Sequence, residues 1–395
     1  MSLPIKIAYI RTHARTAANG SERSLALMID ILTSRGFVEP YIVTNLPDPQ
    51  TEEWISKGYE VFIPPFFTSH NGIGGPERDD KIPNRTIVPK IEPLLIDFMR
   101  RRDIRIIHCN DRYAMWYAAW SAKAVPAKTI IHIRETETLK NYWTQLCRKI
   151  CDQVLVLSSE MKKAVEDEIK GRSPVDFIHS FIDHEKMFPV RHGRKMEIRR
   201  QLGMKENERA IGVIGQLQTR KQQFEVVSYL AEDPKIFPEP LTIYFLSELF
   251  PGKEIYQQEC LRTAEQSELK GRIIFPGLQR NVEDWYRAMD VTLMPSRSEG
   301  LARAMIESLA CGIPVVSTDV CSAREILSKN GCGMVGSKND IPTLVRDAID
   351  LTGDHTRQVS MRMNGNRMIE KLFSTDANCL LYSELYEKLD REARQ

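Results

Sequence analysis

Short apolar runs alternate with segments of helical periodicity along most of this 395-residue chain. The first two runs, at residues 6–10 and 41–43, flank a segment at 21–34 whose apolar residues recur every three or four positions. Such runs predict buried strands, and the periodic segments predict amphipathic helices that cover the sheet. The alternation is therefore typical of a doubly wound α/β fold.

The alternation is interrupted once and then starts again. The strands predicted after the first two lie at residues 61–63, 104–108, 129–133, 154–157 and 175–178, and then at 210–214, 241–246, 272–275, 291–294 and 314–317. The stretch at 181–193 between the two series is polar and contains prolines, as linkers do. We therefore predict two Rossmann-like domains, at residues 1–185 and 186–395, that face a central cleft, with the option that a last helix at 380–394 crosses back. The irregular stretch 68–85 is predicted to be a loop.

Composition argues against several classes of protein. A formal net charge of +2 gives no signal for nucleic-acid binding by the whole chain. No run approaches the roughly 20 apolar residues of a membrane-spanning helix, and the first residues are no secretory signal. The eight cysteines form no Cys-x-x-Cys pair, so neither a zinc site nor a disulfide framework is expected. The expected location is the cytoplasm, and peripheral contact with the inner face of the membrane stays open.

Two glutamates lie on either side of a predicted helix start. Glu299 follows the predicted strand 291–294, and Glu307 lies about two turns further on, in a helical pattern that stops at Gly312. Open parallel sheets bind ligands at the carboxyl ends of their strands, where the next helix also points its free N–H groups. Helix N-termini favour the binding of phosphate, and carboxylates accept hydrogen bonds from sugar hydroxyls. A phosphorylated sugar is therefore the expected ligand. On spacing alone, two solvated glutamates on an amphipathic helix remain an alternative.

The stretch 290–320 resembles the donor-site signature of retaining glycosyltransferases of family 4, which have the GT-B fold. The likeness combines the two glutamates with the Pro-Ser before them, the Ala-Cys-Gly-x-Pro-Val-Val turn and the Thr-Asp after the next strand. It implies that Glu299 positions the donor sugar and that Glu307 binds the ribose hydroxyls. The amides of Gly300 and Leu301 would stabilise the departing diphosphate.

Residues 19–25 are similar to the family's Gly-Gly-x-Glu-Arg loop, which closes over the donor diphosphate. Asn19 replaces the first glycine, so this role carries over to Gly20 only. Glycine allows a backbone to approach a phosphate closely, although a simple tight turn would explain a single glycine as well.

Residues 215–222 are similar to the family's Gly-Arg-Leu-x-x-x-Lys-Gly pattern, in which the Arg and the Lys hold the phosphates. Lys221 matches, whereas Gln216 stands where Arg is expected and Gln222 where Gly is expected. One positive charge is therefore missing, and Arg220 or an arginine of the first domain could substitute for it. A solvated basic helix start is the alternative.

His132 lies at the carboxyl end of the predicted strand 129–133. A lone histidine is more often a structural hydrogen-bonding group than a catalytic one. The resemblance nevertheless favours a catalytic role for His132, as it does for Glu299. The family carries a functional histidine at the end of the equivalent strand, near the sugar carbon that reacts. His108, at the end of the preceding strand, is a weaker candidate.

The resemblance implies a metal-independent retaining hexosyltransferase of polysaccharide biosynthesis. It would move a sugar from a nucleotide-diphosphate sugar, with a UDP-sugar favoured, to a glycan, lipid-linked or other acceptor. The nucleotide sugar is a co-substrate, and neither a cofactor nor a metal is expected. Two alternatives stay open: a nucleotide-sugar epimerase of related fold, and an inactive donor-binding subunit of a glycan-assembly complex, which would explain Gln216.

Overall fold

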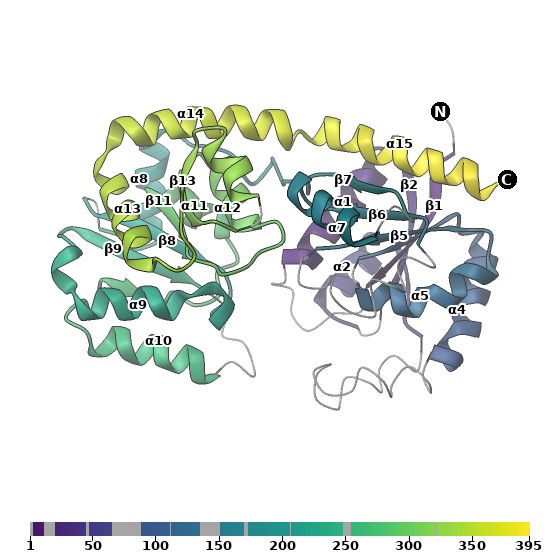
Figure 1. The fold of residues 1–395 in the computed structure, drawn as a ribbon, viewed down its shortest axis with the longest axis horizontal. Coiled ribbons are helices and arrows are strands. Elements are labelled where there is room, and N and C mark those ends of the chain that lie inside the picture. Colours follow the sequence, from purple (N-terminus) through teal and green to yellow (C-terminus); the bar gives the residue numbers. More distant parts are fainter. Residues whose placement is uncertain are drawn as a thin grey trace. The chain divides into compact units, whose positions relative to one another are not determined.

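A computed structural model describes residues 3–11, 20–44, 47–64, 88–110, 112–134, 151–169, 173–205, 207–247, 254–320 and 322–395. The chain forms two compact units (Figure 1). The first comprises Met1–Phe181 together with Thr375–Gln395, and the second comprises Ile182–Ser374. The loop predicted at 68–85 lies outside the described residues.

The first unit is built on a seven-stranded parallel sheet in the order β3-β2-β1-β4-β5-β6-β7. Its strands are β1 (Ile5–Arg11), β2 (Val38–Thr44), β3 (Glu60–Phe62), β4 (Ile106–Cys109), β5 (Lys128–His132), β6 (Gln153–Val156) and β7 (Val175–Phe177). Its helices are α1 (Gly20–Ser34), α2 (Pro49–Ser56), α4 (Val88–Arg102), α5 (Arg112–Ala124), α7 (Ser159–Ile169) and α15 (Thr375–Ala393). The direction of strand order reverses between β1 and β4, as in doubly wound sheets.

Helix α15, drawn in yellow in Figure 1, completes the first unit although it ends the chain. It packs on β1, β4 and β5. Its apolar face enters the core around Ile7 and Ile130, through Cys379, Tyr382, Leu385, Tyr386 and Leu389. Burial of such side chains contributes roughly 1.5–3 kcal/mol each, so α15 is part of the folding unit of Met1–Phe181, from which residues 182–374 separate it in the sequence.

The second unit has a six-stranded parallel sheet in the order β10-β9-β8-β11-β12-β13. Its strands are β8 (Arg209–Ile214), β9 (Leu241–Leu246), β10 (Ile273–Ile274), β11 (Val291–Met294), β12 (Val315–Thr318) and β13 (Gly333–Gly336). Its helices are α8 (His192–Gln201), α9 (Gln223–Glu232), α10 (Glu254–Gln266), α11 (Val282–Ala288), α12 (Arg303–Ala310), α13 (Ile341–Gly353) and α14 (His355–Leu372), with a short 3₁₀ turn η3 (Thr219–Lys221). The predicted doubly wound α/β architecture is confirmed.

Strand β13 was not predicted from the sequence, because glycine begins and ends it and glycine is depleted in strands. The structure gives the reason for Gly333. A Cβ atom at this position would lie 2.3 Å from the main-chain oxygen of Val315 on β12. Glycine therefore allows the close approach of the two strands.

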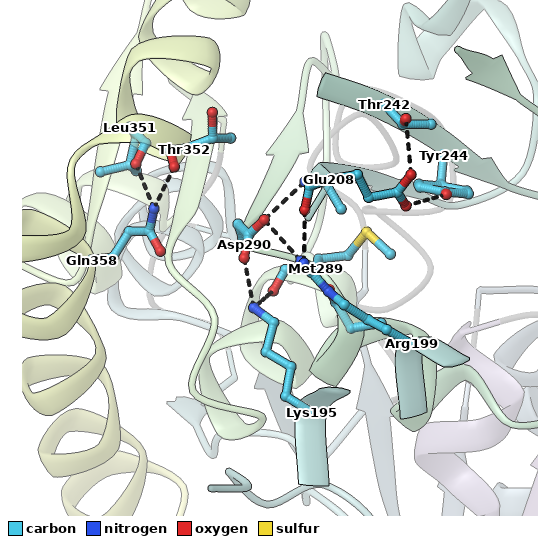
Figure 2. A network of polar contacts seen from close by, with 12 residues as sticks. Lys195, Arg199, Glu208, Thr242, Tyr244, Met289, Asp290, Leu351, Thr352 and Gln358 are labelled. Atoms are coloured by element: carbon cyan, nitrogen blue, oxygen red, sulfur yellow. Dashed lines mark hydrogen bonds and ion pairs between the residues drawn. The ribbon is translucent and has the colours of Figure 1, made fainter. Parts of the chain in front are cut away.

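A buried ion cluster joins α8 to the strand that carries the candidate site. Lys195 and Arg199 lie one turn apart on α8 and bind the two oxygens of Asp290, with Nζ–Oδ1 and Nη2–Oδ2 distances of 2.7 and 2.8 Å (Figure 2). The main-chain N–H of Ala210 on β8 also donates to Oδ2, at 2.8 Å. Burial favours the neutral acid, but the two cations hold the pKa of Asp290 below its ordinary value. The cluster fixes α8 to the amino-terminal ends of the central strands β8 and β11.

Asp290→Asn should lower the free energy of unfolding by about 3–5 kcal/mol, because it leaves two buried cations with a neutral partner. The wild-type contribution is present at neutral pH and is lost as the pH falls through the lowered pKa of Asp290. Asp319→Asn is the matched control, since Asp319 forms an exposed ion pair with Arg324, and should cost less than about 1 kcal/mol. Urea titrations of both variants measure the difference, and equal losses would contradict the assignment.

Candidate functional site

The switch point of the second sheet brings two loops to the same edge. Strands β8 and β11 are parallel neighbours, with Val291 opposite Ile211. Residues 215–222 follow β8 and residues 295–302 follow β11, so both loops leave the carboxyl ends of adjacent strands. Doubly wound sheets bind ligands at this place, because neighbouring connections run to opposite faces there.

The Glu299 carboxylate is held between two cations in these loops. Lys221 Nζ binds Oε1, and Arg220 Nη1 lies 3.1 Å from Oε2. The Ser296 hydroxyl donates to Oε1 at 2.7 Å, and only 7% of the Glu299 side chain is exposed. Burial alone would raise the pKa of this carboxyl, but Lys221 and Arg220 lower it below its ordinary value. Glu299 is therefore ionised at neutral pH, and the group of three carries a net charge of +1.

Gln222 occupies the place where the family pattern has glycine, and its backbone adopts the left-handed conformation with φ 54°. This conformation favours glycine and costs another residue roughly 1–3 kcal/mol when the surroundings impose it. With its amide oriented to match the neighbouring groups, the buried side chain compensates by donating to Pro295 O at 2.9 Å and accepting from Arg297 Nε at 3.2 Å. The main-chain N–H of Arg297 also donates to Arg220 O at 2.8 Å. These bonds fix the two loops to each other.

Glu307 lies on α12, eight residues after Glu299, and is also buried. Its Oε1 accepts from Arg303 Nε and Nη2 at 3.1 and 2.8 Å, and its Oε2 accepts from the Tyr286 hydroxyl at 3.1 Å. A carboxylate has about four acceptor positions, so Glu307 keeps capacity for a hydroxyl of a ligand. Sequence reasoning did not identify Tyr286 or Arg303; the i,i+4 spacing of Arg303 and Glu307 was the available signal for the second.

The other predicted residues of the second unit lie in the same two loops. Gly300 and Leu301 lie just before Ala302, the N-cap residue of α12, and both are buried. Gln216 is half-buried, and its main-chain oxygen accepts from Gln223 Nε2 at 2.8 Å. Of the predicted set, the structure brings Lys221 and Glu299 into direct contact.

Gly20 and His132 belong to the first unit. Gly20 is the first residue of α1, and its main-chain oxygen accepts from Ser24 Oγ at 2.9 Å. Residues 12–19, which complete the loop that resembles the diphosphate loop, lie outside the described residues. His132 ends β5 and is 2% exposed.

The two histidines considered from the sequence lie side by side in the first unit. The ring centres of His108 and His132 are 5.7 Å apart, and Tyr386 OH of α15 lies 2.8 Å from His108 Nδ1. Burial, followed by the charge of Arg134, lowers the pKa of His108 to about 3 and that of His132 well below its usual value. Both rings are neutral at physiological pH. Within the described residues, the Nε2 atom of each has no hydrogen-bond partner.

The second unit therefore presents a group with a net charge of +1 at its switch point, which is a candidate anion site. The first unit presents a neutral histidine, His132, whose Nε2 atom has no partner among the described residues. In the part of the chain that the structure describes, no group of three or more His, Cys, Asp or Glu side chains is placed to hold a metal ion. None of the described helices combines the length and the apolar character needed to cross a membrane.

Two family models match the chain, one in each half. Residues 18–186 match Glycosyltransferase Family 4, and residues 194–368 match Glycosyl transferases group 1. The matched ranges together cover most of both units.

Named relatives share parts of the chain. The lipopolysaccharide core biosynthesis mannosyltransferase LpsB of Rhizobium meliloti is 30% identical over 138 residues, which are 34% of this chain and 39% of that protein. The N-acetyl-alpha-D-glucosaminyl L-malate synthase of Bacillus anthracis is 22% identical over 242 residues, 61% of each chain. The aligned parts thus span less than two thirds of these relatives.

Solved structures match over almost the full length. Anabaena Alr3699/HepE in complex with UDP-glucose has a TM-score of 0.80 and 15% identity, covering 97% of this chain and 100% of that one. The sucrose-phosphate synthase from Thermosynechococcus elongatus has a TM-score of 0.78 and 18% identity, covering 98% and 99%. At these identities the likeness concerns the fold. The chain belongs to the GT-B glycosyltransferases, with a Glycosyltransferase Family 4 amino-terminal half and a Glycosyl transferases group 1 carboxyl-terminal half.

Proposed function

We propose that the protein transfers a sugar from a UDP-sugar to a glycan or lipid-linked acceptor, with retention of configuration and without a metal ion. The observation that carries this proposal is the Glu299 carboxylate held between Lys221 and Arg220 at the switch point of the second sheet. It combines cations for a diphosphate with an ionised carboxylate for sugar hydroxyls.

The names of similar proteins support the choice of substrates. The Anabaena protein was solved with UDP-glucose bound. An Escherichia coli relative, 22% identical over 243 residues, is named UDP-Gal:alpha-D-GlcNAc-diphosphoundecaprenol alpha-1,3-galactosyltransferase. A uridine diphosphate donor and a glycan or lipid-linked acceptor are therefore the first substrates to test.

In the proposed reaction, the bond between the anomeric carbon and the diphosphate oxygen breaks as the acceptor oxygen bonds to the same carbon. The acceptor proton passes to the departing diphosphate. Lys221 and the amides of Gly300 and Leu301 would stabilise the charge that develops on the diphosphate. Glu299 would hold the sugar and Glu307 the ribose. Gly20 would approach the diphosphate from the first unit.

His132 is proposed to orient the sugar as a neutral hydrogen-bonding group. Its burial and lowered pKa exclude a role as a cation at physiological pH, and its Nε2 atom has no partner among the described residues. His132→Ala should therefore reduce turnover more than the affinity for free UDP. The rate should show no titration of His132 between pH 6 and 8.

Chelation should leave the reaction intact, because Lys221 and the amides of Gly300 and Leu301 would stabilise the charge that a metal ion stabilises in other transferases. We expect kcat/KM with a UDP-sugar to stay within about twofold after treatment with EDTA. A loss that magnesium or manganese restores would contradict metal independence. A control with a metal-dependent transferase shows that the chelator is effective.

Nucleoside diphosphate release, measured with and without acceptors, tests the function against its alternatives. A transferase releases UDP in proportion to acceptor glycosylated. An epimerase forms free sugar without an acceptor, and an inactive subunit, which neutral Gln216 would suit, binds UDP without turnover.

A further inference from the structure

We propose that Arg220 is the second cation of the diphosphate site, in the role that the neutral Gln216 does not fill. The inference rests on the proposed function and names a donor-binding residue for it. Its basis is the placement of Arg220 and Lys221 on opposite oxygens of one buried carboxylate.

The negative charge of a bound diphosphate calls for a second cation beside Lys221 and Glu299. A diphosphate carries at least two negative charges when it is bound and more as it leaves. Lys221 is paired with Glu299, so these two side chains alone are neutral. Arg220 gives the group its net positive charge, and Gln216 adds none.

The geometry leaves Arg220 able to bind a ligand. Its Nη1 atom makes both of its contacts, to Ser298 O at 2.5 Å and to Glu299 Oε2 at 3.1 Å. A guanidinium has five N–H donors, so three remain on Nε and Nη2, and no described residue accepts from them. The Arg220 side chain is 36% exposed, compared with 16% for Lys221 and 7% for Glu299, so its outer edge reaches solvent.

The position of Arg220 is fixed by its surroundings. Its main-chain oxygen accepts a hydrogen bond from the N–H of Arg297. Two residues later, the side-chain amide of Gln222 donates to Pro295 O. Holding the guanidinium in one place reduces the conformational entropy lost on binding, and its planar fork suits two phosphate oxygens. Arg297 is a weaker candidate, because its guanidinium pairs with Glu225 and with the Gln222 amide.

The test is a charge relocation measured by titration calorimetry. The probes are UDP, inorganic pyrophosphate and uridine, applied to the full-length protein. Arg220→Ala should weaken binding of UDP and pyrophosphate by about 10- to 100-fold and leave uridine unchanged. Arg220→Lys, which keeps the charge, should lose less. Adding Gln216→Arg to Arg220→Ala should recover at least part of the lost UDP affinity.

Arg346→Ala is the matched control, because this arginine of α13 is exposed and donates to Tyr229 OH. It should bind all three probes like the wild type. Thermal melts establish that each variant is folded. If Arg220→Ala does not fold, the binding of UDP and pyrophosphate by Arg220→Lys and Gln216→Arg tests the inference in its place.

Three outcomes would overturn the inference. Unchanged UDP and pyrophosphate binding by Arg220→Ala means that the second cation comes from elsewhere, including the first unit. An equal loss of uridine binding means that Arg220 only supports the loop. A wild type that binds neither UDP nor pyrophosphate removes both this inference and the proposed function. The first two outcomes, observed beside a wild type that binds UDP and transfers sugar, remove this inference alone.

Discussion

Glu299→Gln should lower kcat for sugar transfer by roughly 10²-fold or more while UDP still binds at least as tightly as in the wild type. The amide keeps the size of the side chain but loses the charge that faces Lys221 and Arg220. The two cations are then less neutralised, which favours the free diphosphate. The donor sugar loses the charged carboxylate that positions its hydroxyls, because the amide offers one neutral acceptor oxygen in place of two charged ones. Binding and turnover should therefore separate in this variant.

Steady-state kinetics with a UDP-sugar, together with calorimetry with UDP, measure the two effects. Glu225→Gln is the matched control, since Glu225 is a carboxylate of the same unit that pairs with Arg297. It should keep kcat within about twofold of the wild type. Parallel losses of UDP affinity and kcat in Glu299→Gln would mean that Glu299 supports the loop instead of positioning the sugar.

Lys221→Ala should instead weaken UDP binding and transfer together, with UDP affinity falling by roughly 10- to 100-fold. The substitution removes a cation and leaves the Glu299 carboxylate, with Arg220 as its remaining cationic partner, near the phosphates. Both the ground state and the more negative transition state lose stabilisation, so kcat should fall as well.

The control for this variant is Lys270→Ala, which removes an exposed lysine that pairs with Glu265. It should leave UDP affinity unchanged. If calorimetry gives the same dissociation constant for Lys221→Ala and the wild type, the phosphates bind elsewhere and the assigned donor site is wrong.

The sequence predicted the strands that carry the site, because parallel strands with buried faces have near-continuous apolar runs. It also indicated that Glu299 and Lys221 each follow a strand, whereas the structure shows that these two strands, β11 and β8, are neighbours. It left open how the missing charge at Gln216 is supplied. The contact of Arg220 with Glu299 joins residues 79 positions apart and depends on the folding of both loops, which no local pattern encodes.

Other features could not be predicted from the sequence for similar reasons. Gly333 reduces the strand signal of β13, although the close approach to Val315 requires it. The contact between His108 and Tyr386 joins residues 278 positions apart, through a helix whose return to the first unit was left as an option. The pairing of Glu307 with Tyr286 likewise depends on the packing of α11 against α12.

The most direct test of the central claim is acceptor-dependent release of UDP from UDP-sugars, with the anomeric configuration of the product determined by NMR. Glycan and lipid-linked acceptors are supplied to the wild type and to Glu299→Gln. The account predicts that UDP release requires an acceptor and that the product has the anomeric configuration of the donor. In Glu299→Gln, UDP release and product formation should both fall strongly. Free sugar formed without an acceptor, or a product of inverted configuration, would contradict it.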